Sequence, residues 1–161
     1  MRPPFKIFPS LSNEKITIRE IGSDDIQHLI EISYYDAIQA TSTSEAAEMQ
    51  DRIDRDYLEG NSIHWCIIDN STSKIVGTCG YYRGFESGSG ELGCVLLAEY
   101  RGKGLMFPAL KLAIDFGLNK MKLKRIKAIT NKKNIKAIKL LEKLNFKNTT
   151  DSEDEIEYLL S

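Results

Sequence analysis

The sequence predicts a single α/β domain of the α+β kind, with helices covering a mixed, mostly antiparallel sheet. Apolar residues recur with a period of two or of 3.6 in the order β-α-α-β-β-β-α-β-α-β-β. Turn-forming clusters join some of the strand patterns directly, which predicts antiparallel hairpins. Two later helical patterns each lie between strands, which predicts crossover connections. Together these patterns predict about seven strands and about four helices.

The N-terminal part predicts one strand followed by two helices. Residues 16–21 alternate apolar and polar, which is typical of a half-buried strand. Ser23 precedes two acidic residues, the pattern of a helix N-terminus, and the following helix carries apolar residues on one face. A second helix is expected over residues 44–58 and ends at Gly60-Asn61. The first dozen residues contain three prolines and are expected to form an irregular arm.

Three strands are predicted in the centre, over residues 63–68, 74–82 and 91–97. The polar cluster at 69–73 turns the first of them back on the second. Further along, helical spacing covers 106–121 and 134–144, and a short strand is expected over 125–130. Two last strands are predicted from Phe146 onward and over 155–160.

Length and composition indicate one ordinary globular domain covering residues 1–161. The net charge of −1 gives no reason to expect a nucleic acid or a membrane as the partner of the whole molecule. Residues 120–147 nevertheless hold eleven Lys and Arg with one acid, which is either a solvated helix face or a field that attracts a phosphorylated cofactor. No export segment or bilayer-length apolar run is present, so a cytoplasmic location is expected.

The three cysteines, Cys66, Cys79 and Cys94, lie in apolar strand patterns. They have neither a zinc-ligand spacing nor a Cys-x-x-Cys arrangement, so buried thiols and no metal site are expected.

The most informative segment is the loop Arg101-Gly102-Lys103-Gly104-Leu105-Met106, which joins a strand to a long helix. Glycines let the backbone approach a ligand closely, and the first N–H groups of a helix lack intrahelical partners. With the helix dipole and two basic side chains, this arrangement predicts a site for phosphate.

Two other phosphate-binding loops are disfavoured by the residues. A Walker A loop requires Gly-x-x-x-x-Gly-Lys-Ser/Thr, which does not occur. The dinucleotide-binding fingerprint requires a third glycine where Phe107 stands, and it belongs at the start of a parallel β-α-β unit.

The loop resembles the (Gln/Arg)-x-x-Gly-x-(Gly/Ala) signature of the GNAT acetyltransferase superfamily. Residues 134–146 are similar to that superfamily's Asn-x-x-Ala/Ser-Ile-x-x-Leu-Glu-Lys-Leu-Gly-Phe segment. Glu91-Leu92-Gly93 before the loop resembles the RimJ/RimL-type branch of N-acetyltransferases. Met106 at the last signature position and Asn145 in place of the usual glycine depart from the pattern.

The resemblance implies an acetyl-CoA-dependent enzyme that transfers the acetyl group directly to a primary amine. The cofactor arm would pair with the strand at Val95 and Leu96, and an N–H near Leu96 or Leu97 would meet the developing oxyanion. The pyrophosphate would lie on the loop, and the expected contacts of the cofactor beyond that strand are Arg101, Gly102, Lys103, Gly104, Leu105, Met106, Phe107 and Asn134. Asn134 is equally expected to be a helix N-cap.

Glu91 is the predicted proton acceptor, directly or through a water, and a surface glutamate at a strand end is nearly as good an interpretation. His64 and His28 are weaker alternatives. A covalent route through Cys94 is disfavoured, because a small core residue explains it better. Leu141 stands where some branches carry a tyrosine acid, so that role has no predicted holder.

The acceptor is predicted to be a protein or peptide N-terminus or a small amine. An acidic cleft would favour a polycation, and the second helix carries Glu45, Glu48, Asp51, Asp54 and Asp56, which could supply one. A non-catalytic acyl-CoA-binding sensor or interaction module is the alternative function. A homodimer is a further possibility for the assembly.

Overall fold

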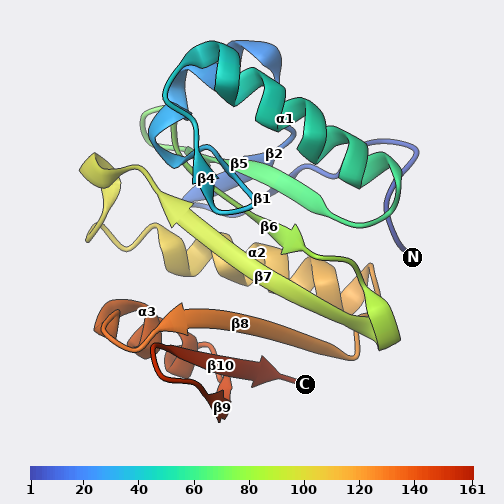
Figure 1. Cartoon of the computed structure of the whole chain (residues 1–161), viewed down its shortest axis with the longest axis vertical. Coiled ribbons are helices and arrows are strands. Elements are labelled where there is room, and N and C mark those ends of the chain that lie inside the picture. The colour runs from blue at the N-terminus through green and yellow to red at the C-terminus, as the bar shows by residue number, and fades with distance from the viewer.

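The computed structural model describes residues 1–161, in which one eight-stranded sheet runs through the molecule (Figure 1). The strand order is β1-β2-β5-β6-β7-β8-β10-β9. Its strands are β1 (Leu11–Ser12), β2 (Ile16–Arg19), β5 (Ile63–Asp69), β6 (Lys74–Tyr82), β7 (Ser89–Leu96), β8 (Arg125–Asn131), β9 (Lys147–Asp151) and β10 (Glu155–Leu160). Three α-helices accompany them: α1 (Thr43–Leu58), α2 (Met106–Asn119) and α3 (Ile135–Lys143). None of these helices combines the length and the apolar character needed to cross a bilayer.

The predicted mixed, mostly antiparallel sheet is confirmed, with β7–β8 as its one parallel pair. An eighth strand, β1, was not predicted, because it is two residues long and lies in the proline-containing arm. The first predicted helix forms as two 3-10 turns, η1 (Ser23–His28) and η2 (Ile30–Ile32). It gives way to a hairpin of β3 (Tyr34–Tyr35) and β4 (Ile38–Gln39), whereas the sequence pattern had placed Tyr34 on the helix.

Helix α2 packs across one face of the sheet, against β2, β6, β7 and β8, and α3 lies against β8 (Figure 1). Helix α1 and the β3–β4 hairpin lie on the opposite side. The close approach of α2 requires Gly117, because the Tyr81 hydroxyl occupies the position where a Cβ would stand. That hydroxyl donates a 2.8 Å hydrogen bond to the carbonyl oxygen of Ala113, which ties the sheet to the helix inside the core.

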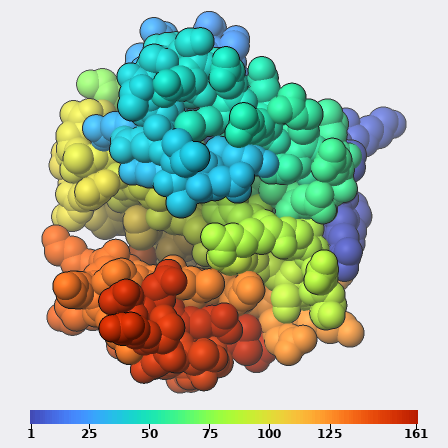
Figure 2. Space-filling model, viewed as in Figure 1, coloured from blue at the N-terminus to red at the C-terminus, as the bar shows by residue number.

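Strands β7 and β8 pair only at their starts. The register joins Ser89 to Arg125, Gly90 to Ile126 and Glu91 to Lys127, and no pairing follows. Figure 1 shows the two strands diverging from that point toward the start of α2. Figure 2 shows a hollow at this level, between the residues of β7 with its following loop and the C-terminal third of the chain. The sheet therefore opens into a wedge beside the loop that the sequence singled out.

Candidate active site

The wedge exposes one edge of β7. Pairs in an antiparallel ladder alternate between hydrogen-bonded and non-hydrogen-bonded. The N–H of Leu97 donates to the carbonyl of Val76 at 2.9 Å, so alternate residues from Leu97 backward direct their backbone groups toward β6. The backbone groups of Leu92, Cys94 and Leu96 consequently face the wedge. The N–H of Leu97 is therefore bonded within the sheet and is not free to meet a developing oxyanion, whereas the N–H of Leu96 is available.

The predicted glycine loop ends at the wide end of the wedge. Gly102 and Gly104 have φ of 76° and 73°, and nothing lies within 4 Å of a Cβ built on either. Helix α2 then begins at Met106, after an N-cap residue, Leu105, that makes no side-chain capping bond. The N–H groups of its first turn therefore have no side-chain cap, as an anion site requires.

Positive charge gathers around this loop. The Arg101 Nε donates a 3.2 Å hydrogen bond to the carbonyl of Leu96, which holds the guanidinium at the mouth of the wedge. Lys103 places its Nζ 5.4 Å from the ring centre of Tyr100. A residue that the sequence reasoning missed, Lys143 at the end of α3, places its Nζ 4.4 Å from the ring centre of Phe107. The spacing of Lys143 along α3 gave no indication that it would reach α2.

Two more predicted contacts border the wedge. The Asn134 Oδ1 accepts a 3.1 Å hydrogen bond from the Ala137 N–H, so this residue is the N-cap of α3. Its amide nitrogen has no bond within the chain. Val95 is 38% exposed, whereas Leu96 is buried on the α2 side. The side chain of Val95 thus lies on the face of the sheet opposite α2.

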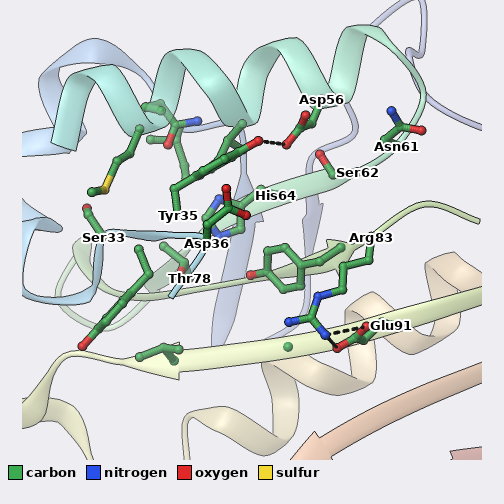
Figure 3. A pocket seen from close by; sticks show the side chains of 18 of the residues that line it. Ser33, Tyr35, Asp36, Asp56, Asn61, Ser62, His64, Thr78, Arg83 and Glu91 are labelled. Carbon is green, nitrogen blue, oxygen red and sulfur yellow. Dashed lines mark hydrogen bonds and ion pairs between the residues drawn. The ribbon is translucent and has the colours of Figure 1, made fainter. Parts of the chain in front are cut away.

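A cavity of about 710 Å³ occupies that opposite face. Its walls come from η2, the β3–β4 hairpin, α1 and the strands β5, β6 and β7. Figure 3 shows Asp56 reaching in from α1, Asp36 from the hairpin and Glu91 from β7. Of the five acids predicted on the second helix, Asp56 alone lines this cavity, and its carboxylate accepts a 2.9 Å hydrogen bond from the hydroxyl of Tyr35.

Glu91 lies in this cavity and is held by cations. Its Oε1 is 3.0 Å from Nη1 of Arg83, and its Oε2 is 4.0 Å from Nζ of Lys127. The Glu91 side chain is 12% exposed, while that of Arg83 is 75% exposed. Arg83 adopts φ of 61°, in the left-handed region that such residues rarely occupy. The sequence gave no signal for this ion pair.

Burial shifts the pKa of two further side chains of the cavity and its border, and a third side chain there is itself buried. Burial lowers the pKa of His64 to about 4, so its imidazole is neutral near pH 7. Burial raises the pKa of the Cys94 thiol to about 12, which leaves very little thiolate and agrees with its interpretation as a packing residue. Ser62, which the sequence reasoning did not single out, directly precedes β5, is 5% exposed and lines the same cavity as His64.

His28, the other histidine, is exposed and does not line this cavity. Leu141 is buried in the core, so it offers no group for acid chemistry. No group of three or more His, Cys, Asp or Glu side chains is arranged to hold a metal ion.

Comparisons with known proteins agree with this geometry. A family profile described as "Acetyltransferase (GNAT) domain" matches residues 15–147. The uncharacterized N-acetyltransferase p20 of Bacillus licheniformis is 31% identical over 145 residues, which cover 85% of this chain and 82% of that protein. A spermidine N(1)-acetyltransferase of Escherichia coli is 41% identical over 56 residues, 35% of this chain and 30% of the relative.

Solved structures show the same fold. A dodecameric spermidine N-acetyltransferase from Vibrio cholerae superposes with a TM-score of 0.77 at 18% identity, covering 92% of this chain and 94% of the other. A ribosomal-protein-alanine acetyltransferase from Vibrio fischeri superposes with a TM-score of 0.76 at 23% identity, covering 94% and 96%.

Proposed function

We propose a function for this chain from its family, because it belongs to the GNAT acetyltransferases. It transfers the acetyl group of acetyl-CoA to a primary amine that carries further positive charge. The family match and the N-acetyltransferase relatives make the chain an N-acetyltransferase. They disfavour the alternative of a non-catalytic sensor. The free edge of β7, which leads into an uncapped helix N-terminus, carries the proposal for the cofactor. The excess of carboxylates in the cavity carries the proposal for a cationic acceptor.

The residues around the wedge fit acetyl-CoA. Gly102 and Gly104 leave room for a pyrophosphate against the backbone, and the N–H groups of Met106 and Phe107 would bind it. Arg101, Lys103 and Lys143 would neutralise its charge. The bound cofactor would supply an activated acetyl thioester.

The pantetheine arm would add to the exposed edge of β7 at Val95 and Leu96, as an extra strand does. Two backbone N–H groups on this edge, those of Cys94 and Leu96, face the wedge. Cys94 also borders the acceptor cavity, whereas Leu96 does not. The N–H of Cys94 is therefore the better-placed donor for the charge that develops on the acetyl oxygen. Asn134 would use its free amide nitrogen to hold the arm from the other side of the wedge.

The charges of the acceptor cavity favour a cationic substrate. Four carboxylates line it, against the guanidinium groups of Arg2 and Arg83, and His64 is neutral. The excess of negative charge is two, which attracts a polyamine-like molecule more than an acidic peptide. The carboxylates are Asp36, Asp56, Glu86 and Glu91. The local similarity to a spermidine N(1)-acetyltransferase supports the same class of acceptor.

Glu91 is proposed as the proton acceptor. An amine is protonated near pH 7 and must lose a proton before it can attack. An incoming ammonium can replace Arg83 as the partner of the Glu91 carboxylate, since the guanidinium is largely exposed and free to swing outward. One proton of the ammonium would pass to Glu91 before the nitrogen attacks the acetyl carbon, and Glu91 would then release it to solvent. As the C–N bond forms and the C–S bond of the thioester breaks, the second proton lost by the nitrogen would balance the charge of the departing CoA thiolate.

Calorimetric titration with CoA tests the cofactor site. Wild-type protein should bind, and Gly104→Val should not, because valine is strained at positive φ and fills the open space. Gly84→Val is the matched control, since Gly84 has φ of 80° and equally open surroundings but lies outside the loop. Retained affinity in Gly104→Val, or equal loss in both variants, would contradict the proposed cradle.

The continuous sheet and its single main core support treating residues 1–161 as one functional unit. Because one structural neighbour is a dodecamer, self-association is also proposed, and light scattering of the purified chain would test it.

A further inference from the structure

Two buried polar groups at the inner end of the acceptor cavity have no partner. The Ser62 Oγ and the His64 Nδ1 are buried and make no hydrogen bond within the protein. Buried polar atoms are nearly always paired, because an unpaired one costs about 1–3 kcal/mol. Both residues line the same cavity: His64 lies in β5, and Ser62 directly precedes that strand. Figure 3 shows them beneath α1, in the cavity that Asp56 and Asp36 also line.

The register of the sheet fixes how far this end lies from the cofactor wedge. His64 pairs with Gly80 on β6, and Gly80 pairs with Gly93 on β7. Two strand spacings separate the backbone of His64 from that of Gly93, which is about 10 Å. Gly93 directly precedes Cys94, whose N–H faces the wedge. The unpaired groups are thus too far from a thioester in the wedge to take part in bond making.

The space between the two ends is bordered by rings rather than by flexible side chains. The His64 ring lies over Gly80, where a Cβ would meet its Cδ2 at 3.1 Å. The Tyr82 ring lies over Gly93, where a Cβ would meet its Cε2 at 2.7 Å. The two rings have centroids 5.5 Å apart. They form a firm floor along which an extended molecule can lie.

We infer that Ser62 and His64 form a specificity subsite that accepts hydrogen bonds from a second amine of the acceptor, about 10 Å from the amine that is acetylated. This inference rests on the proposed function and identifies the end of the substrate that does not react. Neutral imidazole offers a lone pair to an ammonium, and Ser62 adds a hydroxyl oxygen. Asp56 and Asp36 supply the negative charge that a distal ammonium requires.

Acetylation rates across an amine panel test the subsite. Butylamine has no second amine. The second amine of diaminobutane is too close to the first to reach the subsite, whereas diaminooctane and spermidine are long enough to place one amine at the wedge and another at the subsite. We expect Ser62→Ala and His64→Phe to lower kcat/KM for the two long amines about 10- to 100-fold. For butylamine we expect kcat/KM within about twofold of wild type, because removing one hydrogen bond affects only the ligand that makes it. CoA affinity should be unchanged in both variants.

Two results would overturn the inference: an equal loss for butylamine and for the long amines, or no loss for any of them. Absence of turnover by the wild-type protein with every amine would instead refute the proposed function. The subsite is then judged by calorimetry with diaminooctane on the CoA-loaded protein. Binding that both variants weaken supports it, and binding that they leave unchanged overturns it.

Discussion

His64 should make the stability of the fold depend on pH. Burial places its folded-state pKa near 4, against 6.5 for the unperturbed side chain. As the pH falls below 6.5, the unfolded chain binds a proton that the folded chain does not, so folding stability is lost until the pH reaches about 4. At about 1.4 kcal/mol for each pH unit between the two pKa values, the full loss is about 3 kcal/mol.

Urea unfolding at pH 7 and at about pH 4.5 measures this loss. We expect the free energy of unfolding of the wild type to fall by about 2 kcal/mol more than that of His64→Phe and of His64→Gln, neither of which titrates. The Arg19–Asp25 ion pair holds the pKa of Asp25 below its ordinary value and also weakens in acid. It is common to all three proteins, so it cancels in the comparison. Equal losses in the three proteins would show that folding does not lower the pKa of His64 and would refute the reasoning.

Three other perturbations have distinct expected outcomes. Glu91→Gln should lower kcat about 100-fold or more, with CoA affinity unchanged, and a kcat near that of wild type would remove Glu91 as proton acceptor. Lys143→Ala should weaken CoA binding and reduce its dependence on salt, which titrations at two ionic strengths would detect, because Lys143 adds charge beside Phe107 at the start of α2. Tyr81→Phe should lower the free energy of unfolding by about 1–3 kcal/mol, since it leaves the buried carbonyl of Ala113 without its donor; an unchanged urea midpoint would contradict this.

Local patterns were sufficient wherever a segment's conformation follows from its own residues. Helix α1 was predicted from residue 44 and begins at Thr43, because Ser42 accepts a hydrogen bond from the Glu45 N–H as an N-cap should. The first predicted helix fared differently. Its apolar spacing suited a helix, yet the chain forms 3-10 turns and a hairpin, with Asp36 and Ala37 at φ of 49° and 63°. Residues without glycine at such a turn gave no local sign of it.

The candidate site also has one part that local sequence indicates and another that only the fold brings together. The candidate phosphate loop could be proposed from the sequence because its glycines, its charges and the helix that follows are consecutive, so one segment contains the whole feature. The acceptor cavity could not, since Asp36, Asp56, Ser62, Arg83 and Glu91 come from five separate segments. Only the strand register places His64 two strands from Gly93, and only the early end of β7–β8 pairing opens the wedge.

By itself, then, the sequence determined the kind of sheet, because short-range patterns set it. It also indicated the candidate cofactor loop from consecutive glycines and charges, and the chemical class of the enzyme from its resemblance to the GNAT superfamily. The tertiary structure decided which β7 amides are free, which cation holds Glu91, and which polar groups are buried without partners. Those properties depend on distances between residues far apart in the chain, and packing alone fixes such distances.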